Sequence, residues 1–212
     1  MPVNSSRESI LHLISVAREK RQVLDDLAPE NYDDIYKSIF PDPVICFKKE
    51  LELINGKCII CENETDLYLK LHSFVLQNNF PYIFCRDSYI LNQLKVHNIP
   101  FSKNEADFEN MQAGITGCEF LIARTGSVIV SSASESGRQM NVFPPVHIVL
   151  AHVSQLVDYP EDAFSEIQNK YAQGLPSSIS TITGPSRTAD IEKTLVLGAH
   201  GPKEFLVFLS KE

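Results

Sequence analysis

The sequence predicts an α/β protein with a helical arm at its N-terminus. Its 212 residues are 43% hydrophobic and 22% charged, which is typical of a globular domain. Between residues 51 and 209, short apolar runs of the kind found in strands alternate with helical patterns, and this alternation is typical of an α/β sheet. We expect the arm over residues 1–45 and the folded domain over residues 46–212.

The first elements follow from apolar spacing and from turn residues. Residues 10–17 carry apolar side chains at helical spacing, and Ser5 and Ser6 are candidate N-caps. Residues 28–42 are polar and are expected to form a connector or a short helical arm. Residues 51–61 place two apolar runs around an Asn-Gly pair, which favours a β-hairpin because a type I′ turn needs positive φ at both central residues.

The rest of the chain alternates between helices and strands. Helices are expected over residues 66–77, 87–97 and 161–171, and strands over residues 82–85, 121–123, 127–131, 146–151, 180–183 and 205–209. The second and third of these strands flank Thr125-Gly126 and are expected to pair as a hairpin. Residues 184–190 are expected to turn into a short helix.

Charge and hydropathy restrict the partners. The net charge is -8 and the isoelectric point is near 5.3, which argues against broad binding to nucleic acid or to an anionic membrane, because both require clustered Lys and Arg. No stretch approaches the roughly 18 apolar residues that a membrane helix requires, and no signal peptide is recognisable. We therefore expect a cytoplasmic protein without a membrane span.

The cysteines indicate free thiols. They are Cys46, Cys58, Cys61, Cys85 and Cys118. An odd number without a secretion signal argues against a disulfide framework. Cys58 and Cys61 have the spacing of a redox or metal pair, but two isoleucines separate them and no second pair follows, so buried structural thiols are favoured. No metal or cofactor is expected on this chain.

The turn from Gly184 to Asp190 is the first candidate for ligand binding. A glycine after a strand, followed by a helix start, presents backbone N–H groups to an anion. Ser186 and Thr188 add hydroxyl groups, and Arg187 adds a planar cation. Ordinary helix capping accounts for the same residues, with Asp190 in the first helical turn.

Two further loops contain candidate ligand-binding residues. They are Thr125, Gly126, Gly137, Arg138, His200 and Gly201. Arg138 could reach a carboxylate or a phosphate, and His200 could act as an acid or a base beside Lys203. Without a ligand, a hairpin followed by a surface loop explains Gly126 and Arg138 about equally well, and a tight turn with an exposed side chain is the favoured explanation of His200.

Two stretches of this sequence resemble signatures of the LUD domain. The first is GITGCEFLIARTGS at residues 114–127, and the second runs from GPSRTADIE at residues 184–192 to HGP at residues 200–202. The nearest resemblance is to the lactate utilisation protein C family, which identifies residues 46–212 as a LUD domain. The resemblance implies a fold similar to the NagB/RpiA/CoA-transferase group, an α/β sheet with helices on both faces.

The resemblance also implies a function. Members of the family act beside an iron–sulfur subunit and a cysteine-rich subunit in oxidising L-lactate to pyruvate. This chain would be the small subunit without clusters, and the iron–sulfur clusters would lie in its partners. We expect its loops near residues 126 and 187 to line one positively charged hollow, in which Arg138 and Arg187 hold a small anionic ligand and Asp190 orients Arg187.

One departure from the family pattern leaves the activity open. Arg124 stands where the family commonly has Glu before the Thr-Gly pair. An alternative is a stand-alone enzyme of the wider fold group, such as a sugar-phosphate isomerase, a CoA transferase or a folate cyclo-ligase, which would draw on Glu119, Asp190 or Lys203. A regulatory or scaffold role is a third interpretation.

Overall fold

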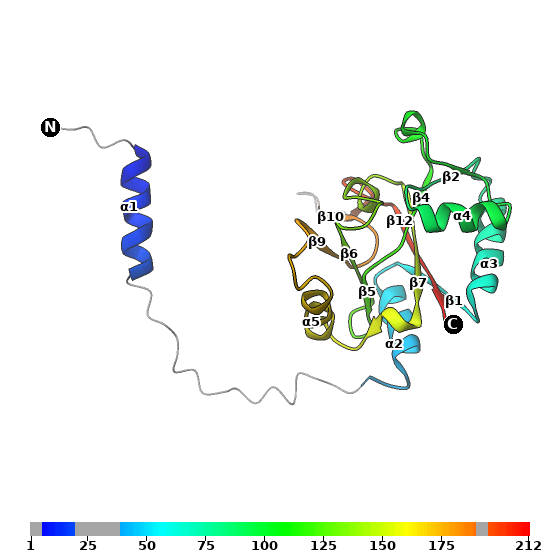
Figure 1. Ribbon diagram of the computed structural model, residues 1–212, viewed down its shortest axis with the longest axis horizontal. Coiled ribbons are helices and arrows are strands. Elements are labelled where there is room, and N and C mark those ends of the chain that lie inside the picture. The colour runs from blue at the N-terminus through cyan, green and yellow to red at the C-terminus, as the bar shows by residue number, and fades with distance from the viewer. Residues whose placement is uncertain (1–5, 20–38, 190–194) are drawn as a thin grey trace. The chain divides into compact units, whose positions relative to one another are not determined.

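The computed structural model describes residues 6–19, 39–189 and 195–212 (Figure 1). The chain divides into two units, one up to residue 38 and one from residue 39. In the first unit, α1 (Ser6–Glu19) is the helix that the sequence predicts, and the apolar side chains from Ile10 to Ile14 on it are exposed. The predicted cap Ser5, the connector as far as residue 38, and Asp190 lie outside the described residues, and the predicted domain boundary after residue 45 stays a prediction.

The second unit alternates helices and strands. Its helices are α2 (Pro43–Leu53), α3 (Glu64–Gln77), α4 (Ser88–Val96) and α5 (Pro160–Lys170). Its strands are β1 (Lys57–Cys61), β2 (Ile83–Phe84), β3 (Phe101–Ser102), β4 (Ala113–Thr116), β5 (Phe120–Ile122), β6 (Ser127–Ser131), β7 (Val146–His152), β8 (Leu156–Val157), β9 (Ile179–Ile182), β10 (Arg187–Ala189), β11 (Leu195–Leu197) and β12 (Glu204–Ser210). The predicted helices and strands after residue 62 are confirmed within a few residues, except near residue 187.

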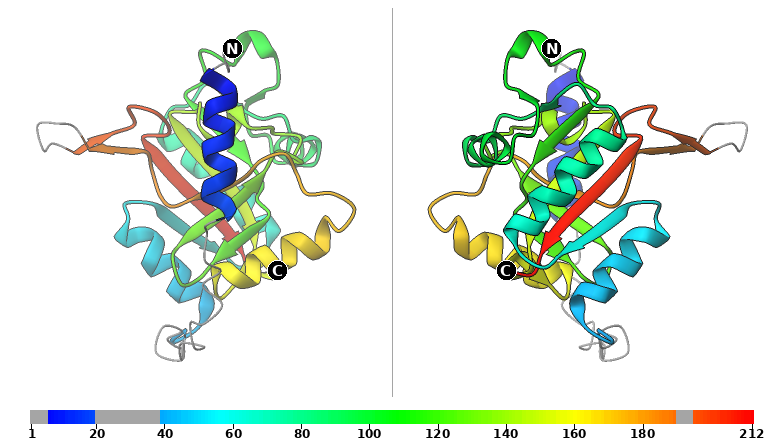
Figure 2. Two further views of the ribbon diagram at one scale, coloured as in Figure 1. Left: turned by 90° about the vertical axis from the view of Figure 1, so that its left-hand side faces the viewer. Right: turned by 90° about the vertical axis from the view of Figure 1, so that its right-hand side faces the viewer.

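A parallel sheet in the order β1-β12-β7-β4-β2-β3 forms the centre of this unit. Side chains of α3 and α4 pack on one face of this sheet, and side chains of α2 and of β5 and β6 pack on the other (Figures 1 and 2). Burial on both faces is the usual condition of a parallel sheet and explains its nearly continuous apolar strands. The predicted α/β class, with helices on both faces of a sheet, is confirmed.

A smaller sheet in the order β8-β5-β6-β9 lies beside the parallel one. It contains the predicted antiparallel hairpin of β5 and β6. Ala163 and Ile167 of α5 pack against Ile122 and Ile129 of this sheet, so α5 covers it. The antiparallel ribbon of β10 and β11 extends away from both sheets (Figure 2).

The predicted hairpin over residues 51–61 is wrong. Residues 43–53 form α2 instead, with Phe47 and Leu51 fully buried on one side of the helix. Asn55 does take positive φ (66°), but it ends a helix, and the amide of Gly56 donates to the carbonyl of Leu51 at 2.9 Å. A left-handed residue serves a helix C-terminus as well as a type I′ turn, so the dipeptide did not distinguish the two.

The predicted helix after Gly184 is also wrong over the described residues. Residues 187–189 form β10, which pairs with β11 in register from Arg187↔Leu197 to Ala189↔Leu195. A strand has no helix dipole and no row of free N–H groups at its start. The electrostatic argument for an anion at this turn therefore does not hold.

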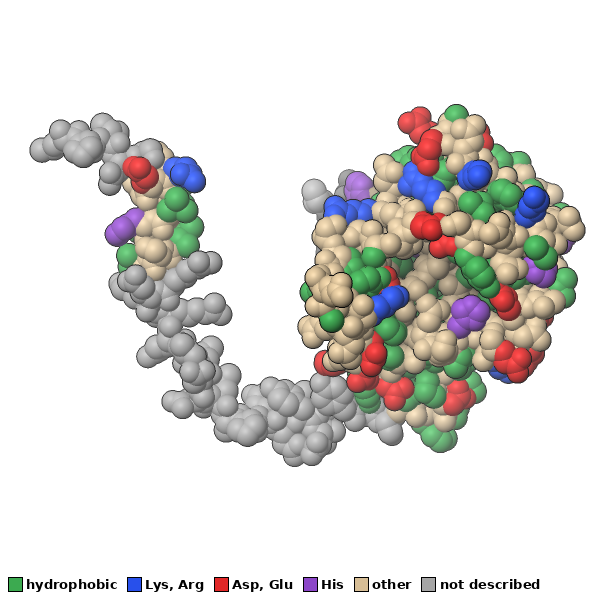
Figure 3. Space-filling view, viewed as in Figure 1, with side chains coloured by type: hydrophobic (Ala, Val, Ile, Leu, Met, Phe, Trp, Pro, Cys, Tyr) green, Lys and Arg blue, Asp and Glu red, His purple; other side chains and the backbone are tan. Residues whose placement is uncertain are grey.

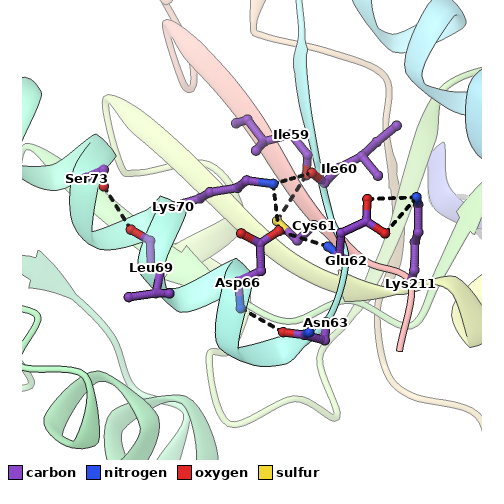
Figure 4. A network of polar contacts seen from close by, with 10 residues as sticks. All are labelled: Ile59, Ile60, Cys61, Glu62, Asn63, Asp66, Leu69, Lys70, Ser73 and Lys211. Carbon is purple, nitrogen blue, oxygen red and sulfur yellow. Dashed lines mark hydrogen bonds and ion pairs between the residues drawn. The ribbon is translucent and has the colours of Figure 1, made fainter.

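A polar network holds β1 against α3 (Figure 4). Asn63 caps α3 by accepting from the amide of Asp66 at 2.9 Å. Lys70 donates both to Asp66, at 2.7 Å, and to the carbonyl of Ile60, at 3.0 Å. The hydrogen bond from Lys70 lowers the pKa of Asp66, so this carboxylate stays ionised where the chain passes from strand to helix. The two cysteines of β1 are free and buried in the two different cores on either side of the sheet, as the sequence predicts for structural thiols.

Candidate functional site

A hollow of about 430 Å³ opens between the smaller sheet and the loops before β10 and β12. We call it the serine-lined hollow. It is lined by Val130, Ser131, Ser132, Arg138, Asn141, Val142, Ser178, Ser180, Thr181, Ile182, Gly184, Ser186, His200, Gly201 and Pro202. None of these lining residues is Asp or Glu, whereas Arg138 supplies a fixed cation, so the hollow suits an anion.

Backbone contacts join the two loops that form one wall of this hollow. The amide of Ser186 donates to the carbonyl of Pro202 at 2.8 Å. A Cβ on Gly201 would lie 3.0 Å from the Cβ of Ser186, so a glycine permits this close approach. Gly184 has φ of 78° and begins the first of the two loops. The loops that carry Ser186 and His200 are therefore fixed against each other.

Arg138 lines the same hollow as these loops. It directly precedes the 3₁₀ turn Gln139–Asn141, and its guanidinium donates to Ser177 Oγ at 2.6 Å. Its side chain is exposed, as is that of His200. The remaining guanidinium N–H groups are available to a carboxylate or a phosphate in the planar geometry that arginine offers.

The structure brings together some of the predicted site residues and separates others. Those that line the serine-lined hollow are Arg138, Gly184, Ser186, His200 and Gly201. Those outside it are Thr125, Gly126, Gly137, Arg187 and Thr188, and Asp190 is outside the described residues. Only part of the predicted set therefore shares one cavity, and it contains one of the two predicted arginines.

Gly126 and Arg187, which lie outside the hollow, converge with Gly184 on the C-terminal end of α2. Gly126 has φ of 61°, and a Cβ there would lie 2.2 Å from the amide nitrogen of Leu51. A Cβ on Gly184 would lie 2.8 Å from the carbonyl oxygen of Ile54, and the guanidinium of Arg187 donates to that same oxygen. A cation there complements the negative end of the helix. The two signature stretches do meet, but at α2.

Arg124 and Thr125 are also remote from the serine-lined hollow. The amide of Arg124 donates to the carbonyl of Asp158 at 3.1 Å, beside β8. Thr125 donates to Ser127 Oγ at 2.8 Å, and Ser127 in turn contacts Thr183 Oγ1 at 2.9 Å. The charge at position 124 therefore does not border the cavity that contains Arg138.

A second hollow of about 260 Å³ lies at the carboxyl ends of the parallel strands. We call it the strand-end hollow. Its lining includes Asp87, Gly117, Cys118, Glu119, Lys170 and Tyr171. From β2 the chain continues to β3, at the edge of the sheet, whereas from β4 it leads to β7, on the other side of β4. The strand order therefore reverses between β2 and β4, and the hollow lies at the carboxyl ends of these two strands. Open α/β sheets usually bind ligands at this point.

Glu119 is the buried charge of the strand-end hollow, with 7% of its side chain exposed. Lys170 donates to its Oε2 at 2.7 Å, and Tyr171 donates to its Oε1 at 2.8 Å. Ser131 donates to the same Oε1. Burial opposes ionisation of Glu119, but the hydrogen bonds from Lys170, Ser131 and Tyr171 outweigh it and lower the pKa of this carboxyl group.

Sequence reasoning missed this second group as a site. It treated Asp87 as a helix cap, which is confirmed, since Asp87 accepts from the amide of Ile90 at 3.0 Å. In the sequence, Lys170 and Tyr171 were predicted only as the end of a helix. Asp87 comes three residues after β2 and Gly117 directly after β4, but recognising this signal required β4, which was not predicted, and the strand order.

Charge is mixed on the visible face of the molecule. Figure 3 shows Asp and Glu interspersed with Lys and Arg there, without an extended patch of one sign. In the part of the chain that the structure describes, no group of three or more His, Cys, Asp and Glu is arranged to hold a metal ion. Among the same residues, no helix has the length and apolar character that crossing a membrane requires.

Comparisons with known proteins identify the fold and the relatives. The profile of the LUD domain matches residues 46–210. An uncharacterised protein of Neisseria meningitidis serogroup B is 38% identical over 100 residues, which cover 47% of this chain and 42% of that protein. Proteins named Lactate utilization protein C from Bacillus licheniformis and Bacillus subtilis are each 38% identical over 96 residues, which cover 44% of this chain and 40% of theirs. The aligned part of the chain thus spans less than half the length of these relatives.

A solved structure shares the fold. It is that of a DUF162 family protein from Deinococcus radiodurans, with a TM-score of 0.56 and 16% identity over 79% of this chain and 96% of that one.

Proposed function

Because this chain belongs to the LUD domain family, we propose that it takes part in lactate utilisation as a subunit that binds a small anionic ligand in the serine-lined hollow. The names of the relatives called Lactate utilization protein C support a role in lactate utilisation. We infer an anionic ligand because Arg138, Ser186 and His200 line one cavity and no carboxylate lines it. A carboxylate or a phosphate is the chemistry that such a cavity recognises.

We also propose partner subunits and a cellular location for this chain. The chain acts in the cytoplasm beside an iron–sulfur subunit and a cysteine-rich subunit, which carry the clusters, and it binds no cofactor itself. The free cysteines support this division, because Cys58 and Cys61 are buried in the two different cores on either side of the parallel sheet and therefore do not face one shared site.

A calorimetric titration tests the ligand class. The purified chain is titrated with L-lactate, pyruvate and inorganic phosphate, and the same titrations are made with Arg138→Ala. Loss of a charge-assisted hydrogen-bond donor should raise Kd about tenfold or more. Arg187→Ala is the matched control, since Arg187 is also exposed but lies outside the hollow, and its Kd should equal that of the wild type. Equal Kd values for wild type and Arg138→Ala would refute this assignment of the hollow.

Affinity purification from the native cell tests the partners. The tagged chain should recover proteins that show the visible absorption of iron–sulfur clusters after anaerobic purification. Recovery of the chain without any such protein, with and without lactate in the growth medium, would contradict the proposed assembly. Turnover of lactate by the single purified chain would instead favour the stand-alone enzyme.

A further inference from the structure

We propose that the strand-end hollow binds a hydroxyl-bearing tail of the same ligand whose anionic group lies in the serine-lined hollow. This inference rests on the proposed function and deepens it by naming the substrate class. That class is a small carboxylate or phosphate that carries a hydroxylated chain and is larger than lactate itself.

The two hollows are neighbours. Val130, Ser131 and Asn141 line both of them, so one wall is common. The serine-lined hollow alone has about 430 Å³, which is within the range of pockets that hold ligands of drug size. A three-carbon acid does not require that volume, and a longer ligand can extend past Ser131 into the strand-end hollow.

Asp87 and Lys170 give the strand-end hollow both an acceptor and a donor. Asp87 uses one carboxylate oxygen to cap α4, which leaves its other oxygen available to a donor. Lys170 gives one of its three hydrogens to Glu119, and among the described residues no further acceptor of it is found. The hollow therefore offers an acceptor and a donor, and a hydroxyl group satisfies both because it donates and accepts.

The charge of the strand-end hollow argues against a second anion. Its lining has two carboxylates, Asp87 and Glu119, and one ammonium group, that of Lys170. The serine-lined hollow has the opposite character, since its lining has an arginine and no carboxylate. The anionic end of the ligand therefore belongs with Arg138, and the uncharged end belongs with Asp87 and Lys170.

The space in front of Gly117 is open. Among the described residues other than its two chain neighbours, no atom lies within 4 Å of the position that a Cβ on Gly117 would take, and its φ is outside the left-handed region. Neither packing nor backbone strain therefore requires glycine there. Its effect is to keep the end of β4 open toward the hollow, where a ligand can approach the backbone.

The same feature provides a test. The whole chain is titrated with glycerol 3-phosphate and with propyl phosphate, which has the same phosphate and a tail of the same length without hydroxyl groups. Hydrogen bonds to charged partners should make glycerol 3-phosphate bind about tenfold or more tightly. Gly117→Val adds side-chain atoms at a residue that lines the hollow and whose Cβ meets no packed neighbour within 4 Å, and it should bring the ratio of the two Kd values close to one. Asp87→Asn, which keeps a good helix cap, should reduce the ratio as well.

The outcomes separate this inference from the proposed function. If propyl phosphate binds and glycerol 3-phosphate gains nothing, the strand-end hollow does not hold the tail and the inference is wrong. If the gain persists in Gly117→Val that retains the wild-type Tm, the tail lies elsewhere and the inference is again wrong. If neither compound binds, the anion site in the serine-lined hollow is refuted, and the inference falls with it.

Discussion

Replacing Lys170 by Met should destabilise the protein through the buried carboxylate of Glu119. Lys170 is 53% exposed whereas Glu119 is 7% exposed, so the pair is intermediate between a surface ion pair and a buried one. Surface pairs contribute about 0–1 kcal/mol, and removing one partner of a buried pair costs about 3–5 kcal/mol. Ser131 and Tyr171 still donate to Glu119, so we expect a loss of about 2 kcal/mol, or roughly 4–8 °C in Tm.

The pH dependence of Lys170→Met provides a second, independent signal. In the wild type the pKa of Glu119 lies below its ordinary value of 4.5, so its contribution to stability is complete above that pH and is lost as the pH falls further. We expect the loss of Lys170 to let burial outweigh the two remaining donors, Ser131 and Tyr171, and so to raise the pKa of this carboxyl above its ordinary value. The folded variant then binds a proton more readily than the unfolded chain, and its stability deficit relative to the wild type should shrink between pH 7 and pH 5.

Urea unfolding at pH 7 and at pH 5 measures both effects. Lys57→Met is the matched control, because the ion pair of Lys57 with Glu204 is about half-exposed on both sides (59% and 46%). That variant should differ from the wild type by less than about 0.5 kcal/mol. The reasoning is refuted if Lys170→Met is as stable as Lys57→Met, or if its deficit grows toward acid pH.

Three further predictions concern Arg187, two glycines and a buried histidine. Arg187→Ala should lower the free energy of unfolding by about 0.5–1 kcal/mol, because it removes a cation from the end of α2, while ligand titration stays unchanged. Gly126→Ala should cost more than about 2 kcal/mol in chemical unfolding, because its Cβ would lie 2.2 Å from the amide of Leu51, whereas Gly137→Ala at similar φ meets no atom within 4 Å and should cost about 1 kcal/mol. Burial lowers the pKa of His147 to about 3, so as the pH falls the unfolded chain takes up a proton there before the folded chain does. The free energy of unfolding should therefore fall by about 2 kcal/mol from pH 7 to pH 5, and His147→Gln should largely remove this pH dependence.

These three predictions have distinct contrary results. Weaker ligand binding by Arg187→Ala would show that Arg187 takes part in binding the ligand. Equal costs for the two glycine variants would show that the contact with α2 is unimportant. If His147→Gln keeps the pH dependence of the wild type, a group other than His147 causes that dependence.

Most of the secondary structure after residue 62 could be predicted because local signals and tertiary packing agree there. Asp87 caps α4 as its position before an apolar helical run indicates, and β7 has the continuous apolar pattern of a strand buried on both faces. Asn55 shows the opposite case. Its positive φ was predictable, but whether a helix or a strand precedes it depends on the packing of Phe47 and Leu51.

The candidate site was less predictable because it depends on which loops meet in space. Arg138 and His200 do share a cavity, which neither flanking sequence indicates alone. Arg187 occurs in the most specific motif of the chain, yet its guanidinium contacts Ile54 at the end of α2. A conspicuous Gly, Arg or Thr in a signature can thus reflect a tight contact between segments. The Glu119 cluster depends on strand order and on the end of α5, which no local pattern indicates.

An NMR titration of the ¹⁵N-labelled chain with L-lactate and with glycerol 3-phosphate tests the assignment of the ligand site most directly. We predict saturable shifts at the amides of Ser186, Gly201 and Arg138, and, with glycerol 3-phosphate alone, also at Gly117. Shifts confined to the end of α2 around Ile54 and Arg187, or no saturable shift with either compound, would contradict the account.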